Sequence, residues 1–168
     1  MKVTLSNLLL IINQKSKEMS SLRYDVMNNS VVTKDRELDG TETILTDVKD
    51  FEEVLGIYKT ELEALTKYKN ILAKMNATVE VKDGMTIIEA INMVSSLRKE
   101  LELFDTLANK TPSLGRKFDG NGSNSYYRVV DLNYNIDLIK DERQSLVDRI
   151  SELESAIQQV NATTFVEI

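Results

Sequence analysis

The chain has 168 residues, with 21 Lys and Arg against 27 Asp and Glu, and a formal net charge of −6. It contains no histidine, cysteine or tryptophan, which excludes the usual zinc ligands, a cysteine nucleophile, a histidine base and any disulfide. The net negative charge argues against general binding of nucleic acids, which requires a basic face. Because these metal ligands and catalytic residues are missing, we expect a protein that holds no metal or cofactor and has no catalytic activity.

No segment of the sequence is apolar for long enough to cross a membrane. The first twelve residues, MKVTLSNLLLII, contain only one lysine, and Ser6 and Asn7 interrupt the apolar run. No cleavage site of small residues follows, as a signal peptide would require. We expect a cytoplasmic protein that does not contact membranes.

The first half of the chain predicts two helices. The first spans residues 5–27, with Thr4 as its N-cap, and a polar segment follows it over residues 28–43. The second spans about residues 45–76. Residues 78–81 favour an extended chain, and Lys82, Asp83 and Gly84 favour a turn.

The second half predicts two more helices. The third opens with a capping box between Thr86 and Glu89 and continues to about residue 109, with Pro112, the only proline, just beyond it. The fourth begins after Asp131. Between residues 132 and 160 it carries an apolar stripe that only Arg143 interrupts, with members Leu132, Ile136, Ile139, Leu146, Ile150, Leu153, Ile157 and Val160. This spacing places one side of a long helix against another helix.

The two halves resemble each other. Placing Thr4 on Thr86 also aligns Lys17-Glu18 with Lys99-Glu100, and residues 75–78 (MNAT) resemble residues 160–163 (VNAT). Both of the latter segments precede short extended tails, which we expect to pair with each other. We predict an all-α protein with one domain, residues 1–168. Its fold would be a four-helix coiled-coil-like bundle of two duplicated helical hairpins, 1–82 and 83–168. A short β-hairpin or extended insertion would lie between the third and fourth helices.

Several apolar residues lie beside the main helical stripes, namely Leu9, Leu10, Ile11, Ile88 and Leu103. A long, thin bundle has much surface for its volume, so these residues predict seams shared between subunits. We expect a homo-oligomer.

The second half resembles the septicolysin-like family of small bacterial helical proteins. The matching residues are 83–91 (DGMTIIEAI), 96–98 (SLR), 130–132 (VDL), 142–143 (ER), 146–150 (LVDRI) and 158–164 (QQVNATT). The resemblance implies a small helical fold and a family of unassigned activity.

Two arginines occupy apolar positions of the predicted helices. Arg98 lies eleven residues before the end of the third helix, and Arg143 lies about as far into the fourth. In an antiparallel hairpin they would face each other, and two facing guanidinium groups repel unless an anion lies between them. A phosphate or carboxylate would suit bidentate contact with arginine. In the alternative interpretation, each arginine points outward and pairs with a nearby carboxylate, Glu100, Glu102, Asp105 or Glu142.

The connector over residues 111–130 predicts a β-hairpin around a glycine-rich centre, residues 119–125. Its flanks combine cations with tyrosines: Arg116, Lys117, Tyr126, Tyr127 and Arg128. This combination suits an anionic ligand that contains a ring. In the alternative interpretation, the aromatic side chains only pack on the end of the bundle.

These patterns favour a non-catalytic, oligomeric helical protein that binds a small anionic ligand, with nucleotide-like molecules among the candidates, as a sensor or sequestering protein. The ligand-binding residues would be Arg98, Arg143, Arg116, Lys117, Tyr126, Tyr127 and Arg128. The alternative is a structural or adaptor protein that acts through protein–protein contacts along its helices.

Overall fold

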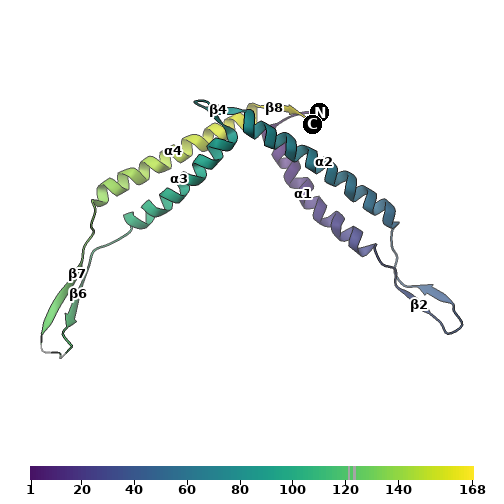
Figure 1. The fold of residues 1–168 in the computed structure, drawn as a ribbon, viewed down its shortest axis with the longest axis horizontal. Helices are drawn as coiled ribbons and strands as arrows, with labels where there is room; N and C mark the ends of the chain where they lie inside the picture. Colours follow the sequence, from purple (N-terminus) through teal and green to yellow (C-terminus); the bar gives the residue numbers. More distant parts are fainter. Residues whose placement is uncertain (121, 123) are drawn as a thin grey trace. The chain divides into compact units, whose positions relative to one another are not determined.

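The computed structural model describes residues 1–120, 122 and 124–168. In chain order, the described residues form β1 (Lys2–Thr4), α1 (Leu5–Asn28), β2 (Lys34–Arg36), β3 (Glu42–Ile44), α2 (Phe51–Thr78), β4 (Glu80–Lys82), β5 (Met85–Thr86), α3 (Ile87–Ala108), β6 (Ser113–Phe118), β7 (Ser125–Val130), α4 (Ile136–Thr163) and β8 (Phe165–Glu167) (Figure 1). The strands form four antiparallel sheets of two strands each. The prediction of an all-α protein is therefore wrong, and the fold is mixed α/β.

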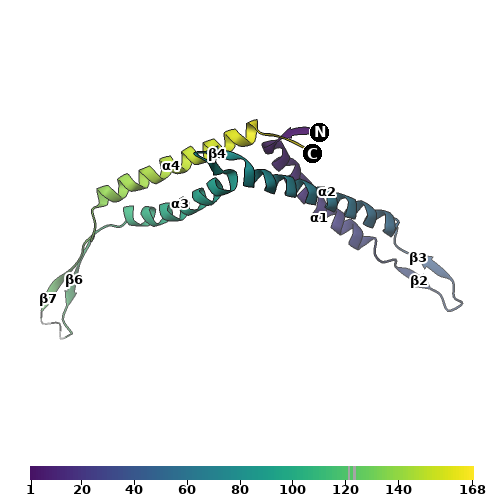
Figure 2. The same cartoon turned by 45° about the horizontal axis from the view of Figure 1, so that its top comes forward.

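The chain divides into two compact units, Met1–Val79 with Gln158–Ile168, and Glu80–Ile157. Within the first unit α1 lies beside α2, and within the second α3 lies beside α4 (Figures 1 and 2). In each unit a β-hairpin joins the two helices and extends beyond their ends. These are β2–β3 in the first unit and β6–β7 in the second.

The order of elements is the same in residues 1–82 and in residues 83–168: strand, helix, two strands, helix, strand. The end strands of the two halves pair reciprocally. β1 pairs with β8, so that Val3 lies opposite Val166, and β4 pairs with β5. The prediction that the two extended tails pair with each other is wrong, because each tail pairs with the strand that opens the other half.

The turn between β4 and β5 confirms the prediction for residues 82–84. Lys82 lies opposite Met85, so Asp83 and Gly84 form a two-residue loop, and both have positive φ, 52° and 78°. Positive φ at both loop residues defines a type I′ turn, whose twist matches that of the two strands. The Asp-Gly sequence favours this conformation.

In the first unit, the core between the helices is small. Leu5, Leu8 and Ile12 of α1 are buried, as are Val54 and Leu65 of α2. The side-chain hydroxyl of Thr4 accepts a hydrogen bond from the backbone N–H of Asn7 at 3.2 Å, which confirms the predicted N-cap.

The second helix of this unit begins later than predicted, at Phe51. Asp50 is its N-cap and accepts a hydrogen bond from the backbone N–H of Glu53 at 2.9 Å. Leu45, the predicted start, instead donates its backbone N–H to the carbonyl oxygen of Thr33 at 2.8 Å, which extends the β2–β3 ladder. The apolar residue at position 45 is therefore not part of a helical stripe.

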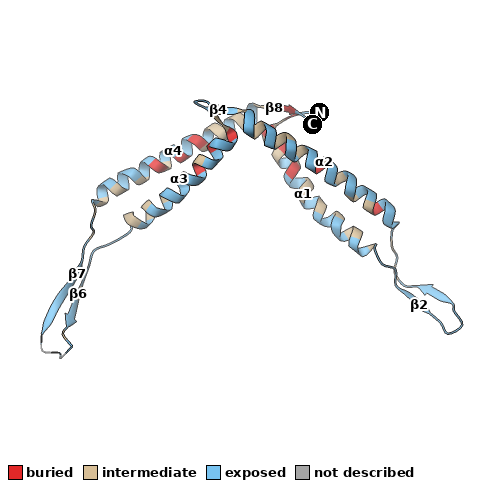
Figure 3. Ribbon diagram, viewed as in Figure 1, coloured by how far each residue is buried: buried red, intermediate tan, exposed pale blue. Residues whose placement is uncertain are grey.

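In the second unit, α3 and α4 share an apolar cluster of Val94, Leu97, Leu146, Ile150 and Leu153 (buried residues are red in Figure 3). Leu146, Ile150, Leu153 and Ile157 of the predicted stripe belong to this cluster or pack against it, which confirms the interface over that part of α4. Leu132, Ile136, Ile139 and Val160 are half-buried. The capping box is also confirmed: the Thr86 backbone N–H donates to Glu89 Oε2 at 2.8 Å, and the Glu89 backbone N–H donates to Thr86 Oγ1 at 3.4 Å.

The fourth helix begins at Ile136, after the predicted position. The Asn135 side chain accepts a hydrogen bond from the backbone N–H of Asp137 at 2.9 Å and so satisfies a free donor of the first turn. The Tyr134 hydroxyl donates to the carbonyl oxygen of Leu107 at 2.7 Å. This contact joins the segment before α4, which contains Leu132, to the end of α3.

Candidate functional site

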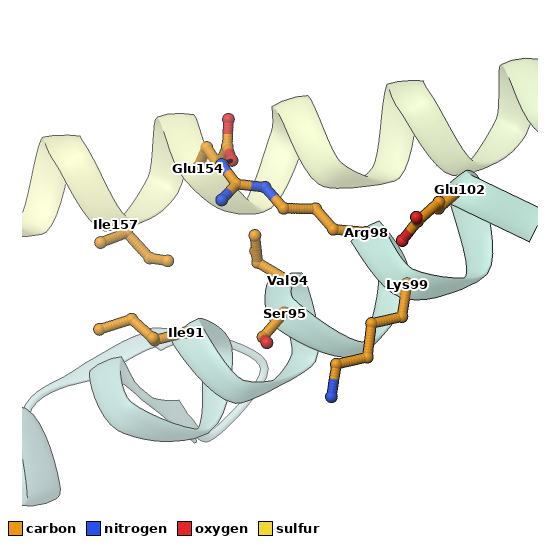
Figure 4. Close-up of a pocket in the computed structure, with 8 residues that line it drawn as sticks. All are labelled: Ile91, Val94, Ser95, Arg98, Lys99, Glu102, Glu154 and Ile157. Atoms are coloured by element: carbon orange, nitrogen blue, oxygen red, sulfur yellow. Dashed lines mark hydrogen bonds and ion pairs between the residues drawn. The ribbon is translucent and has the colours of Figure 1, made fainter. Parts of the chain in front are cut away.

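An open groove of about 490 Å³ lies between α3 and α4. Its apolar part consists of Ile91, Val94 and Ile157, which face one another in Figure 4. Its polar lining residues are Ser95, Arg98, Lys99, Glu102 and Glu154. Arg98, which lines this groove, is one of the two arginines predicted to bind an anion.

Arg98 extends across this groove and forms an ion pair with Glu154 of α4 (Figure 4). The Arg98 side chain is 64% exposed, and that of Glu154 is 36% exposed. Ion pairs exposed to this degree contribute little to stability. The carboxylate nevertheless neutralises the guanidinium charge that an anionic ligand in the groove would need.

Arg143 does not lie opposite Arg98. Its Nε–H donates to Oδ1 of Asp105 on α3, one of the carboxylates named in the alternative interpretation. Since Glu154 and Arg143 are eleven residues apart on one helix, their backbones are about 16 Å apart along the helix axis. The structure therefore separates the two arginines and pairs each with a carboxylate.

The first turn of α4 lies beyond the level at which α3 ends, and this explains the error in the predicted register. α3 has 22 residues and α4 has 28. The predicted register counts residues from the connector along each helix, and it therefore assumes that α4 starts level with the end of α3. The ion pairs between Arg98 and Glu154 and between Asp105 and Arg143 show instead that the first turn of α4 extends past the end of α3.

The other five predicted site residues all lie on the β6–β7 hairpin, whose existence confirms that prediction. The centre of this hairpin includes residues 121 and 123, which lie outside the described residues. Arg116 lies opposite Tyr127, Lys117 opposite Tyr126, and Arg128 opposite Gly115. Because side chains alternate along a strand, Lys117, Tyr126 and Arg128 share one face, and Arg116 and Tyr127 share the other.

The cations of this hairpin contact aromatic rings and hydroxyls. Arg128 lies 6.0 Å from the centre of the Tyr126 ring, and its Nη2 donates to the Tyr126 hydroxyl at 3.4 Å. On the other face, Arg116 lies 5.3 Å from the centre of the Phe118 ring and donates to the Ser125 hydroxyl at 2.9 Å. Among the described residues, no ion pair joins Arg116, Lys117 or Arg128 to a carboxylate.

Both faces of the β6–β7 hairpin expose apolar and aromatic side chains. The exposed residues are Leu114, Phe118, Tyr126, Tyr127, Val129 and Val130. The interpretation in which these aromatics only pack on the end of the bundle does not fit, because every residue of both strands except the half-buried Gly115 is exposed. An isolated two-stranded hairpin is marginally stable in water.

Sequence reasoning missed the β2–β3 hairpin, which it described as a polar segment. All six strand residues are exposed, so no alternation of apolar and polar residues marks the strands. One signal was available: Asp39-Gly40, a dipeptide favoured in hairpin turns. Gly40 has a φ of 89°, and Asp39 accepts a hydrogen bond from the backbone N–H of Thr41 at 2.9 Å.

The described part of the chain contains no group of three or more acidic residues that could hold a metal ion. Within the same residues, no helix is both long enough and apolar enough to span a membrane.

No protein-family model matches the chain. No curated protein matches it in sequence. It is similar to the solved structure of a functionally unknown conserved protein from Corynebacterium diphtheriae, with a TM-score of 0.65 and 15% sequence identity. The similarity covers 99% of this chain and 100% of the other. At this identity the similarity shows the fold alone.

Proposed function

We propose that this protein is a non-catalytic interaction protein, a scaffold or adaptor that binds other protein chains through its β-hairpins. The observation that carries the proposal is the β6–β7 hairpin, which exposes Phe118, Tyr126 and Tyr127 together with three aliphatic residues. Exposed apolar residues that cluster in this way mark interaction sites in soluble proteins. Aromatic residues and arginine are also the residue types enriched at protein–protein interfaces.

The numbers of buried and exposed apolar residues in the described part of the chain support the same function. Fourteen apolar residues are buried, whereas 23 large apolar residues are exposed. The neutralised arginines of α3 and α4 argue against the helices as the main binding site for an anion. Five of the seven ligand-binding residues predicted from the sequence lie on the β6–β7 hairpin, so we assign the interaction surface to the hairpins.

Photo-crosslinking in cells tests this function. A benzophenone amino acid replaces Tyr127, which is 65% exposed, or Leu38, the fully exposed residue of the β2–β3 turn. The same amino acid at Lys69, an exposed position of α2, is the matched control. We expect discrete protein adducts from the two hairpin positions and none from Lys69. Equal, diffuse labelling from all three positions would contradict the proposal.

A second candidate function is the binding of a small anionic ligand at the β6–β7 hairpin alone. The specific observation in its favour is that Arg116, Lys117 and Arg128 have no carboxylate partner among the described residues. Calorimetry with nucleotides and inorganic phosphate tests it. Saturable heat that the double variant K117E/R128E loses would support this candidate, and the absence of heat with all of these ligands would exclude it.

A further inference from the structure

The two β-hairpins carry opposite charge. The hairpin of β6 and β7 has three cations, Arg116, Lys117 and Arg128, and one acid, Asp119. The hairpin of β2 and β3 has two cations, Lys34 and Arg36, and four acids: Asp35, Glu37, Asp39 and Glu42. Since every copy of the chain carries both hairpins, each copy presents a basic surface and an acidic one.

Internal ion pairs leave one face of the β2–β3 hairpin purely acidic. Glu42 binds both Lys34, at 3.2 Å, and Arg36. These three residues share a face, because Arg36 lies directly opposite Glu42 and Lys34 lies two positions away. Asp35 lies on the other face. Glu37 lies two residues after Asp35, and its backbone N–H still donates across the hairpin to the carbonyl oxygen of Thr41 at 2.8 Å. The alternation of side chains therefore continues to Glu37, which shares the face of Asp35.

The cations of one face of the β6–β7 hairpin match this arrangement. Lys117 and Arg128 are diagonal neighbours, because Arg128 lies opposite Gly115, two residues before Lys117. Such neighbours are about 7–8 Å apart. Asp35 and Glu37, two residues apart on one strand, are separated by about 7 Å. Tyr126 lies opposite Lys117 on the same face and is 47% exposed.

The hairpins also have apolar side chains and free backbone edges at which to join. Leu38, at the turn between β2 and β3, is fully exposed. Each strand of a two-stranded sheet has one edge without a hydrogen-bonded neighbour, and such an edge readily pairs with another chain. In each unit the hairpin extends beyond the helix ends, so the helices of its own pair do not cover it (Figure 1).

We propose that the β6–β7 hairpin of one copy docks on the β2–β3 hairpin of a second copy. Lys117 and Arg128 then contact Asp35 and Glu37, and Tyr126 contacts Leu38. This inference rests on the proposed function and names the partner as another copy of this chain. The contact joins two different surfaces, so each copy offers both a donor and an acceptor surface. Repetition of the contact gives a closed ring or a linear assembly.

Charge exchange between variants tests this contact. The full chain is studied by sedimentation equilibrium as wild type, as D35K/E37K, as K117E/R128E, and as the four-fold variant that combines both. We expect the wild type to associate and each double variant to be monomeric, because its two hairpins then carry the same sign of charge. An equimolar mixture of the two double variants, and the four-fold variant alone, should associate again.

Two further measurements sharpen the test. Arg116 lies on the opposite face of the hairpin from Lys117, so R116E should retain the association that K117E, with the same change of charge, weakens. Salt should also weaken wild-type association, since raising it from about 0.1 M to about 1 M shortens the screening length from about 10 Å to about 3 Å.

Three outcomes would overturn the inference: a monomeric wild type, association of D35K/E37K as strong as that of the wild type, or no association in the mixture. Restoration in the mixture shows that both double variants are folded. A monomeric wild type together with hairpin adducts to a different protein would retain the proposed function and reject self-association. The absence of hairpin adducts would reject the proposed function itself.

Discussion

Arg98 on α3 forms an ion pair with Glu154 on α4, across the open groove between the two helices. The pair is the structural reason why the groove does not present a free guanidinium to a ligand. Together with the pair between Asp105 and Arg143, it also shows which levels of the two helices lie opposite each other.

The Arg98–Glu154 pair should contribute little to folding. We expect Glu154→Gln to change the free energy of unfolding by less than about 1 kcal/mol, because both side chains are substantially exposed and water screens their attraction. Urea unfolding followed by circular dichroism measures this. Glu142→Gln on the same helix is the matched control, because Glu142 is exposed and has no ion pair among the described residues. A loss of several kcal/mol in Glu154→Gln alone would show that the pair is structural.

The apolar cluster, by contrast, should dominate the stability of the second unit. Leu97 is 4% exposed and belongs to the cluster of α3 and α4, whereas Leu103 on the same helix is 56% exposed. We expect Leu97→Ala to lower the free energy of unfolding by about 2–5 kcal/mol, because it removes buried methyl groups and leaves a cavity. Leu103→Ala is the matched control and should have a small effect. Equal effects in urea unfolding would mean that Leu103 is also covered in solution.

The capping box should make the start of α3 sensitive to acid. Hydrogen bonds from the backbone and side chain of Thr86 hold the pKa of Glu89 below its ordinary value of 4.5. The contribution of the carboxylate to stability is therefore complete above pH 4.5 and is lost as the pH falls through the lower folded-state pKa. We expect the stability difference between wild type and Glu89→Gln to disappear over this acidic range. Glu100→Gln, an exposed change in the same helix, should show no such trend in thermal unfolding measured against pH.

The link between α1 and α2 should weaken in alkali. Lys15 forms an ion pair with Glu61, and the hydrogen bond to that carboxylate raises the pKa of Lys15 above its ordinary value of 10.5. The charged lysine therefore stabilises the folded chain fully below pH 10.5, and this contribution is lost as the pH rises through the higher folded-state pKa. We expect Lys15→Gln to reduce the stability of the first unit at neutral pH and to remove this alkaline loss. Thermal unfolding measured against pH checks this, with Lys17→Gln, at an exposed neighbouring position, as the control. An unchanged alkaline profile in Lys15→Gln would contradict the role of Lys15.

Local sequence features predicted much of the helical part of the fold. The capping box at Thr86 and Glu89, the N-cap at Thr4 and the apolar stripe of α4 all depend on residues within a few turns of each other, and each is confirmed. The starts of α2 and α4 were placed too early. Leu45 and Leu132 fit an apolar period, but Leu45 extends the β2–β3 ladder, and Leu132 lies in the segment whose Tyr134 donates a hydrogen bond to Leu107 at the end of α3.

The candidate site was predictable only in part. The β6–β7 hairpin follows from strand-forming residues around a glycine-rich centre, so its five cationic and aromatic residues were found together. The β2–β3 hairpin was missed because its exposed, charged strands carry no apolar alternation. The partners of Arg98 and Arg143 were also not predictable as a set, because they depend on how far one helix is shifted along the other.

By itself, the sequence determined which stretches become helices, where capping residues begin them, and which hairpin gathers arginine and tyrosine, since these depend on the conformational preferences of neighbouring residues. Only the tertiary structure decided that β8 pairs with β1, and that Arg98 meets Glu154. Those contacts join residues far apart in the chain. The conformational preferences of neighbouring residues do not distinguish between the possible partners, so the packing of whole helices and strands selects them.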